Sequence, residues 1–182
     1  ERMEAGGETD LRASFKEFAS RPRQTGLTVI ISDFLDPGGF EAGLEIHHLV
    51  HGLEFYAGLA SKVRGSHVPL PQKNAYGMVV RQPIGVCGGI VPWNFPLTLM
   101  GTKLGPALAA GNTIIIKPAS TTPLATIKVI ELIAQATFGE GKAQKTLPKG
   151  TVNIVTGPGG SVGEELLRNP GIRRIAFTGS TP

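Results

Sequence analysis

The sequence has a single cysteine, Cys87, and no long apolar run. One cysteine excludes an internal disulfide and fits a reducing compartment. No stretch approaches the roughly 18 apolar residues that indicate a membrane span, and no charged-then-apolar signal peptide opens the chain. We therefore expect a cytoplasmic protein without membrane contact. Because the chain opens on Glu1 rather than on methionine, we also expect the native start to be missing.

Aspartate is missing from the sequence after position 36, and charge is unevenly divided along the chain. Residues 1–43 carry a net charge of −3, whereas residues 44–182 carry +7. This shift predicts two segments of different origin, divided between residues 43 and 44. A basic surface attracts nucleic acid, but the aromatic and basic side chains are not interleaved as in a nucleic-acid-binding face. We expect no nucleic-acid partner, and attribute the charge to a phosphate-bearing cofactor or a solvated basic face.

The N-terminal half is only partly informative about structure. A short helix is predicted over residues 9–19, and residues 26–31 indicate a buried strand that runs towards Asp33. An aspartate after a strand suits a ligand site and a turn or cap equally well. Residues 44–60 have the apolar spacing of an amphipathic helix.

Two histidines of that helix, His47 and His51, are four residues apart on its polar face. This spacing could hold a metal, but His48 stands where the zinc-peptidase helix motif has its glutamate base. A solvated helix face explains the same pattern, and we predict no metal site.

From residue 77 the pattern predicts strands that alternate with helices. Strands are predicted at 77–82, 84–91, 113–116, 152–155 and 174–177, and helices at 97–110, 123–136 and 161–168. Residues 62–73 and 139–150 are predicted loops. Such alternation implies the α/β class, with a parallel sheet, right-handed crossovers and flanking helices.

Four of the predicted strands run directly into a polar or glycine-rich motif. These motifs are PWNFP at 92–96, KPAS at 117–120, TGPGG at 156–160 and TGST at 178–181. Ligands of open α/β sheets bind beyond the carboxyl ends of the strands. The four ends together therefore predict one ligand site.

The individual motifs each leave alternatives open. The pattern Gly157-x-Gly159-x-x-x-Gly163 opens a helix, where backbone N–H groups bind phosphate, but it is one residue longer than the common Rossmann pattern and ordinary glycine turns look similar. Lys117 could bind ribose hydroxyls or a phosphate, or be solvated. Asn94 could donate its amide to a developing oxyanion, or serve as a turn residue or cap before the helix that follows.

Together these motifs resemble the aldehyde dehydrogenase superfamily. The matching stretches are GVCGGIVPWNFPLTLMGTKLGPALAAGNTIIIKPAS, LPKGTVNIVTGPGGSVGEEL and RRIAFTGSTP, and the resemblance runs from about residue 46 to the end. It implies an incomplete Rossmann-like parallel sheet that belongs to an oxidoreductase. Such an enzyme oxidises a small-molecule aldehyde to a carboxylic acid with NADP or NAD, through a cysteine thioester.

The resemblance also implies roles for individual residues. Asn94 would help to form the oxyanion hole, Lys117 would hold the adenosine ribose, and Ser180 would contact the pyrophosphate. The residues implied to bind the cofactor are Ile90, Val91, Pro92, Trp93, Lys117, Ala119, Ser120, Gly159, Gly163, Phe177, Thr178, Gly179 and Ser180.

Two departures from the family pattern change the expectation. Ser120 stands where the family often has a glutamate that would repel a 2′-phosphate, so we predict that the parent enzyme accepts NADP. The serine at this position also resembles the pattern of the succinate-semialdehyde dehydrogenase branch. The family's cysteine nucleophile and glutamate base lie downstream of FTGST, and Cys87 is expected to be a buried hydrophobe inside a strand. We therefore expect this chain alone to be inactive.

The first 43 residues resemble a different family. The stretch RPRQTGLTVIISDFLDPGGFEAGL is similar to part of a von Willebrand factor A-like domain, without the DxSxS motif that supplies its main metal ligands. A gene fusion is the resulting hypothesis. The functions left open are an aldehyde dehydrogenase fragment, a non-catalytic nucleotide-binding or inert chain, and a metal-dependent adhesion-type module. Residues 77–82 resemble a strand that often joins subunits, so the full-length parent is expected to be a homo-oligomer.

Overall fold

The computed structural model describes residues 40–139 and 144–180 of the chain. The helix predicted at 9–19, the strand predicted at 26–31 and Asp33 lie outside these described residues. The elements below run from α2 (Phe40–Ala60) to β8 (Arg174–Phe177).

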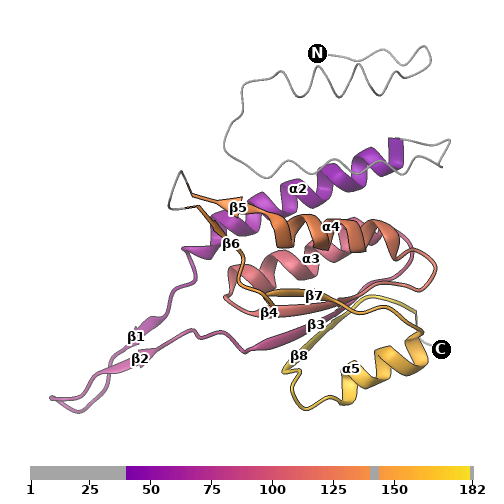
Figure 1. Cartoon of the computed structure of the whole chain (residues 1–182). Helices are drawn as coiled ribbons and strands as arrows, with labels where there is room; N and C mark the ends of the chain where they lie inside the picture. Colours follow the sequence, from indigo (N-terminus) through magenta and orange to yellow (C-terminus); the bar gives the residue numbers. More distant parts are fainter. Residues whose placement is uncertain (1–39, 140–143, 181–182) are drawn as a thin grey trace.

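The centre of the molecule is a four-stranded parallel sheet in the order β7-β4-β3-β8 (Figure 1). Its strands are β3 (Val86–Ile90), β4 (Thr113–Lys117), β7 (Val152–Ile154) and β8 (Arg174–Phe177). In register, Ile90 lies opposite both Lys117 and Phe177, so the central strands end level with one another. This arrangement confirms the predicted α/β class and the parallel sheet.

The two central strands form for different reasons. The first four residues of β4 are β-branched, and such residues favour a strand buried on both faces of a parallel sheet. β3 instead contains Gly88 and Gly89. A Cβ atom on Gly89 would lie 2.8 Å from Cδ1 of Ile116 and 3.5 Å from Cβ of Lys103. The bare backbone of β3 therefore leaves room for Ile116 beside it and for the helix above it.

Helices cover both faces of the sheet. α3 (Pro96–Ala109) and α4 (Leu124–Gln135) lie on one face, and α5 (Glu164–Arg168) lies on the other (Figure 1). α3 begins with a proline in its first turn, which the missing N–H and fixed φ of proline favour. Its fully buried Met100 and Leu104 belong to the core above β3 and β4.

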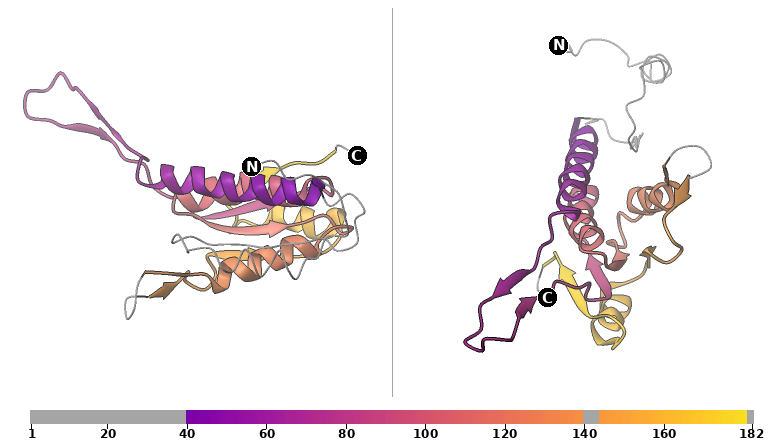
Figure 2. Two further views of the ribbon diagram at one scale, coloured as in Figure 1. Left: turned by 90° about the horizontal axis from the view of Figure 1, so that it is seen from above. Right: turned by 90° about the vertical axis from the view of Figure 1, so that its left-hand side faces the viewer.

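α2 forms a further layer on the outside of α3 (Figure 2). The two helices approach closely because glycines of α3 face large side chains of α2. A Cβ atom on Gly101 would lie 2.9 Å from Cδ1 of Leu49, and one on Gly105 would collide with the ring of Tyr56. Leu49 is 1% exposed as a result, and α2 is held against α3.

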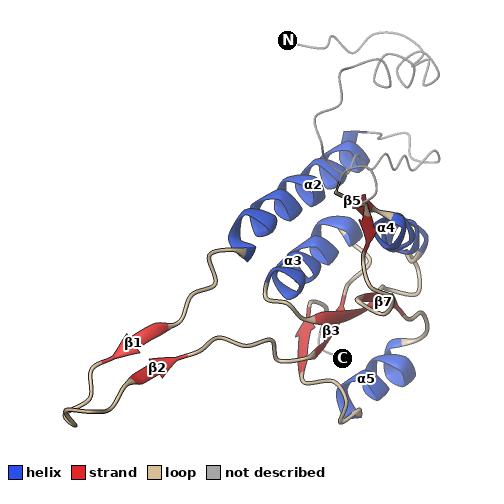
Figure 3. Cartoon of the chain, turned by 60° about the vertical axis from the view of Figure 1, so that its left-hand side comes forward, coloured by secondary structure: helices blue, strands red, loops and turns tan. Residues whose placement is uncertain are grey.

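Two short hairpins differ from the prediction. β1 (Ser66–Val68) pairs antiparallel with β2 (Gly77–Val79), and this hairpin extends away from the body of the molecule (Figure 3). The predicted loop over 62–73 was therefore wrong at β1, and the predicted strand 77–82 was too long. All three residues of β1 are exposed, so no apolar alternation marked it as a strand.

The second hairpin pairs β5 (Thr137–Phe138) with β6 (Lys145–Thr146), so part of the predicted loop 139–150 is also a strand. The helix predicted at 161–168 begins as a π-helical turn, η2 (Gly159–Gly163), and becomes α-helical only in α5. Within the described ranges, no helix is long and apolar enough to cross a membrane.

Candidate functional site

The carboxyl ends of the strands enclose a cavity of about 640 Å³. Its walls contain Asn94 and every residue predicted to bind a cofactor except Gly163, together with Leu99. The lining is Ile90, Val91, Pro92, Trp93, Asn94, Leu99, Lys117, Ala119, Ser120, Gly159, Phe177, Thr178, Gly179 and Ser180. Gly163 lies just behind the wall, since a Cβ atom on it would be 4.0 Å from Cε of Lys117. The predicted site residues therefore meet in one place.

Backbone hydrogen bonds continue at the residues that directly follow the strands, and they hold the strand-end motifs next to one another. The N–H of Val91 donates to the carbonyl of Lys117 at 3.0 Å, and the N–H of Thr178 donates to the carbonyl of Ile90 at 3.1 Å. A third bond joins the N–H of Val155 to the carbonyl of Ile116 at 2.9 Å. The motifs thus leave the sheet side by side.

Lys117 is the buried charge of the cavity wall. It is only 4% exposed, and its Nζ donates to the carbonyl of Pro118 at 3.1 Å. Burial lowers the pKa of this ammonium group, because water no longer solvates its charge. An ammonium group has three donors, so donors remain for ligand hydroxyls or a phosphate.

The glycine motif after β7 is shaped by conformation and by space. Gly157 has a φ of 142°, and a Cβ atom on it would lie 2.5 Å from Cγ2 of Val162. A Cβ on Gly159 would meet nothing within 4 Å, so Gly159 leaves its part of the wall open. The hydroxyl of Ser120 donates to the carbonyl of Gly157 at 3.0 Å and ties this turn to the end of β4.

Asn94 lies exposed at the rim of the cavity, next to the exposed Trp93. It lies in the bend that precedes α3 but does not cap that helix, so of its two structural alternatives the cap was wrong. The N-cap residue of α3 is Phe95, in a left-handed conformation, and its side chain makes no cap hydrogen bond. The carboxylate of Glu45 in α2 accepts the N–H groups of Leu97 at 2.8 Å and Thr98 at 3.3 Å instead.

Lys103 is a second buried cation next to the cavity, and no sequence motif marked it as part of the site. Its Nζ donates to Oγ1 of Thr178 at 2.7 Å and to the carbonyl of Leu99 at 3.2 Å, and both partners line the cavity. Burial lowers its pKa. The available signal was that Lys103 is the only charge in the apolar stretch of α3.

Replacement of Lys103 by methionine is expected to reduce the slope with which the free energy of unfolding rises as the pH becomes alkaline. The pKa of Lys103 is lower in the folded chain than the value of about 10.4 for an exposed lysine. Between these two values the unfolded chain binds more protons, so the free energy of unfolding rises with pH up to about 10.4. Chemical denaturation at several pH values measures this slope. Lys128→Met, which removes an exposed lysine, is the control, and a slope in Lys103→Met equal to that of the unmodified chain would contradict the expectation.

Cys87 lies inside β3 and is 6% exposed, as expected of a small core residue. Burial raises the pKa of its thiol, and the nearby charge of Arg174 only partly opposes this. A raised pKa disfavours the thiolate that a nucleophile needs. Cys87 therefore suits packing rather than catalysis.

The histidines of α2 lie on an exposed face. The rings of His47 and His51 stack at 6.2 Å between centroids. Among residues 40–139 and 144–180, no group of three or more side chains is arranged to hold a metal ion.

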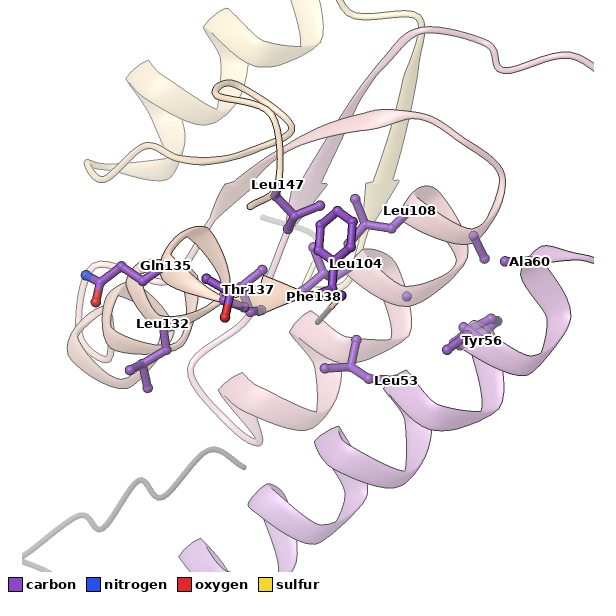
Figure 4. Close-up of a pocket in the computed structure, with 16 residues that line it drawn as sticks. Leu53, Tyr56, Ala60, Leu104, Leu108, Leu132, Gln135, Thr137, Phe138 and Leu147 are labelled. Carbon is purple, nitrogen blue, oxygen red and sulfur yellow. The ribbon is translucent and has the colours of Figure 1, made fainter. Parts of the chain in front are cut away.

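A larger, apolar groove of about 1060 Å³ lies between α2, α3, α4 and β5 (Figure 4). Leucine and aromatic side chains such as Leu53, Tyr56, Leu108 and Phe138 point into it. None of its described lining residues is charged, so among these residues it offers no ionised group to bind an anionic ligand, and its polar side chains are limited to those of Tyr56, Gln135 and Thr137. The smaller cavity at the strand ends is therefore the candidate site.

The sequence matches the model of the aldehyde dehydrogenase family over residues 37–182. Betaine aldehyde dehydrogenase from Bacillus subtilis is 43% identical over 139 residues, which are 76% of this chain and 26% of that protein. Succinate-semialdehyde dehydrogenase (NADP(+)) from Escherichia coli is 41% identical over 141 residues, which are 78% of this chain and 27% of that protein. The chain spans about a quarter of the length of these curated relatives.

Solved structures also resemble this chain. Glyceraldehyde-3-phosphate dehydrogenase from Methanocaldococcus jannaschii, solved with NADP, superposes with a TM-score of 0.67 at 32% identity, over 78% of this chain and 29% of that one. PnpE, solved with nicotinamide adenine dinucleotide, superposes with a TM-score of 0.68 at 43% identity, over 76% of this chain and 26% of that one. The matches give no support to the von Willebrand factor A-like resemblance expected in the first 43 residues.

Proposed function

The chain belongs to the aldehyde dehydrogenase family, and we propose from this that its strand-end cavity binds NADP or NAD for the oxidation of an aldehyde to a carboxylic acid. The chain covers about a quarter of its relatives, so the complete reaction is proposed for the whole protein. The role proposed for the described residues is to hold the nucleotide and to stabilise charge on the substrate oxygen.

The charge of the cavity is the observation that carries this proposal. The ammonium group of Lys117 is less than 10% exposed at its wall, and that of Lys103, equally buried, lies behind the wall and bonds to the lining residues Thr178 and Leu99. None of the described lining residues is acidic. Uncompensated buried cations favour an anionic ligand, because little water screens the attraction. The pyrophosphate of a dinucleotide supplies the complementary charge.

We assign the ends of the cavity to different parts of the cofactor. Lys117 and the open backbone at Gly159 suit the adenosine ribose and the pyrophosphate. Trp93 and Val91 suit the nicotinamide side, which accepts a hydride from the substrate when the cofactor is bound. Asn94, at the rim, would donate its amide to the substrate oxygen as negative charge develops there.

Titration of the chain with NADP and NAD tests this proposal directly. Trp93 is the only tryptophan, is 67% exposed and lines the cavity, so its fluorescence is expected to change as either nucleotide binds. Calorimetry gives the affinities independently. A folded chain that binds neither nucleotide would refute the assigned role, whereas saturable binding supports it.

Ser120→Glu is expected to reverse a preference for NADP. The Ser120 hydroxyl is exposed at the cavity wall, where its single O–H can turn from the carbonyl of Gly157 to a 2′-phosphate, and Lys117 lines the same cavity. A carboxylate at this position would repel that phosphate, and a cost of about 1.5–3 kcal/mol corresponds to roughly 10- to 100-fold weaker NADP binding. Calorimetric titration of Ser120→Glu and Ser120→Ala with both nucleotides measures the effect. An equal loss for NAD and NADP would count against this role of Ser120.

The substrate and the assembly are further parts of the proposal. The serine at position 120 leads us to favour a semialdehyde, as in the succinate-semialdehyde dehydrogenase branch. Tyr76 and Met78 are 86% and 71% exposed on the β1–β2 hairpin, an area suited to burial against another subunit of a homo-oligomer.

We retain the separate origin of residues 1–43 as a proposal, supported by the charge shift along the chain.

A further inference from the structure

We infer that Glu45 is a positioning residue, whose carboxylate holds the turn that presents Trp93 and Asn94 at the cavity rim. This inference rests on the proposed function only for its consequence on cofactor binding. Glu45 itself does not line the cavity, and it acts through the first turn of α3.

The start of α3 needs a hydrogen-bond acceptor from outside its own segment. The first N–H groups of a helix have no partner within it, and a polar N-cap side chain normally accepts them. Phe95 occupies the N-cap position and has no acceptor, and Pro96 has no N–H. The carboxylate of Glu45 accepts the next two N–H groups, those of Leu97 and Thr98, at 2.8 and 3.3 Å. Its negative charge also suits the positive end of the helix.

Glu45 is held in place by the packing of α2 on α3. One helical turn further along α2, Leu49 fits against Gly101, where a Cβ atom would approach Cδ1 of Leu49 to 2.9 Å. Leu49 is 1% exposed, so α2 cannot shift without losing this contact. The acceptor therefore reaches α3 from a rigid neighbour rather than from a free side chain on a loop.

The turn before α3 is fixed at both ends. The hydroxyl of Thr122, after β4, donates to the carbonyl of Trp93 at 3.3 Å. At the other end, Phe95 has a φ of 53°, a backbone conformation that residues other than glycine rarely adopt. Without the cap, Leu97 and Thr98 would have to bind water, and Phe95 would lose the restraint that maintains this conformation. Trp93 and Asn94 would then no longer keep one orientation.

Amide hydrogen exchange measured by NMR tests the cap itself. In Glu45→Ala, the amides of Leu97 and Thr98 are expected to exchange at least about tenfold faster, while amides in the last turn of α3 keep their rates. Glu45→Gln, which retains an acceptor oxygen without the charge, should give exchange rates between those of the unmodified chain and of Glu45→Ala. Glu54→Ala removes an exposed glutamate of the same helix and should leave the exchange rates of the Leu97 and Thr98 amides unchanged. Unchanged exchange in Glu45→Ala, or an equal rise in Glu54→Ala, would overturn the inference.

A pair of ligands tests the consequence for the cavity. Glu45→Ala is expected to weaken NADP binding several-fold and to leave the affinity for adenosine 2′,5′-bisphosphate unchanged, because that fragment lacks the nicotinamide side. An equal loss for both ligands would mean that Glu45 supports the cavity only in general, and would overturn its role at the turn. If the unmodified chain bound neither ligand, the proposed function would fail, while the exchange experiment would still decide whether Glu45 holds the turn.

Discussion

Lys117→Met is expected to weaken NADP binding by about 10- to 100-fold, which corresponds to the roughly 1.5–3 kcal/mol of hydrogen bonds to a charged group. Methionine keeps an unbranched side chain that matches the lysine stem as far as Cε, and it lacks the ammonium group. Calorimetric titration of both chains with NADP measures the loss. Lys128→Met, on the exposed face of α4, is the control and is expected to bind NADP like the unmodified chain.

The same substitution is expected to leave the folded chain at least as stable at neutral pH. Lys117 is 4% exposed and its charge has lost most of its hydration, which the lowered pKa reflects. Methionine removes that desolvation cost together with one hydrogen bond to the carbonyl of Pro118. Loss of binding with unchanged or higher thermal stability would identify Lys117 as a binding group. Loss of both would show that it supports the fold instead, and unchanged affinity would remove it from the site.

Much of the candidate site could be predicted because its residues follow strands directly. A parallel sheet brings the ends of its strands to one edge, so a motif at the end of each strand, such as KPAS at the end of β4, lies near the others whatever the loops do. Ile114 and Ile116 are fully buried on β4, and the run of apolar side chains that this burial requires is what predicted the strand from the sequence. The role of each residue in binding stays a prediction, which the titrations test.

Other parts of the site depend on contacts that local sequence patterns do not record. The bond between Glu45 and Leu97 joins residues 52 positions apart, and that between Lys103 and Thr178 joins residues 75 apart. Each bond depends on how two packed elements are placed relative to one another. A glutamate or a lysine in a sequence does not by itself predict which distant residue it will contact. The exposed strand β1 was missed for the opposite reason, because nothing is buried against it and no alternation of side chains marks it.

The largest effect on stability is expected from Ile116→Ala, at about 3–4 kcal/mol of the free energy of unfolding. Ile116 is 0% exposed on β4, beneath α3, and it directly precedes Lys117. The alanine removes buried methyl groups and leaves a cavity that the surrounding strands cannot fill. Urea denaturation of the variant measures the loss. Leu124→Ala, which shortens a side chain 78% exposed at the start of α4, is the control and should change the stability little.

A second substitution tests whether the cavity is the cause. In the unmodified chain, Gly89→Ala would bring its Cβ to 2.8 Å from Cδ1 of Ile116, so it should be destabilising. In the Ile116→Ala background that atom is gone, and the next neighbours, Cδ1 of Ile114 and Cβ of Lys103, lie at 3.5 Å. Gly89→Ala should therefore cost less in the variant than in the unmodified chain, and the difference is the coupling between the two residues. Additive effects would mean that β3 and β4 adjust independently, which is incompatible with Ile116 filling the space that the bare backbone of Gly89 leaves.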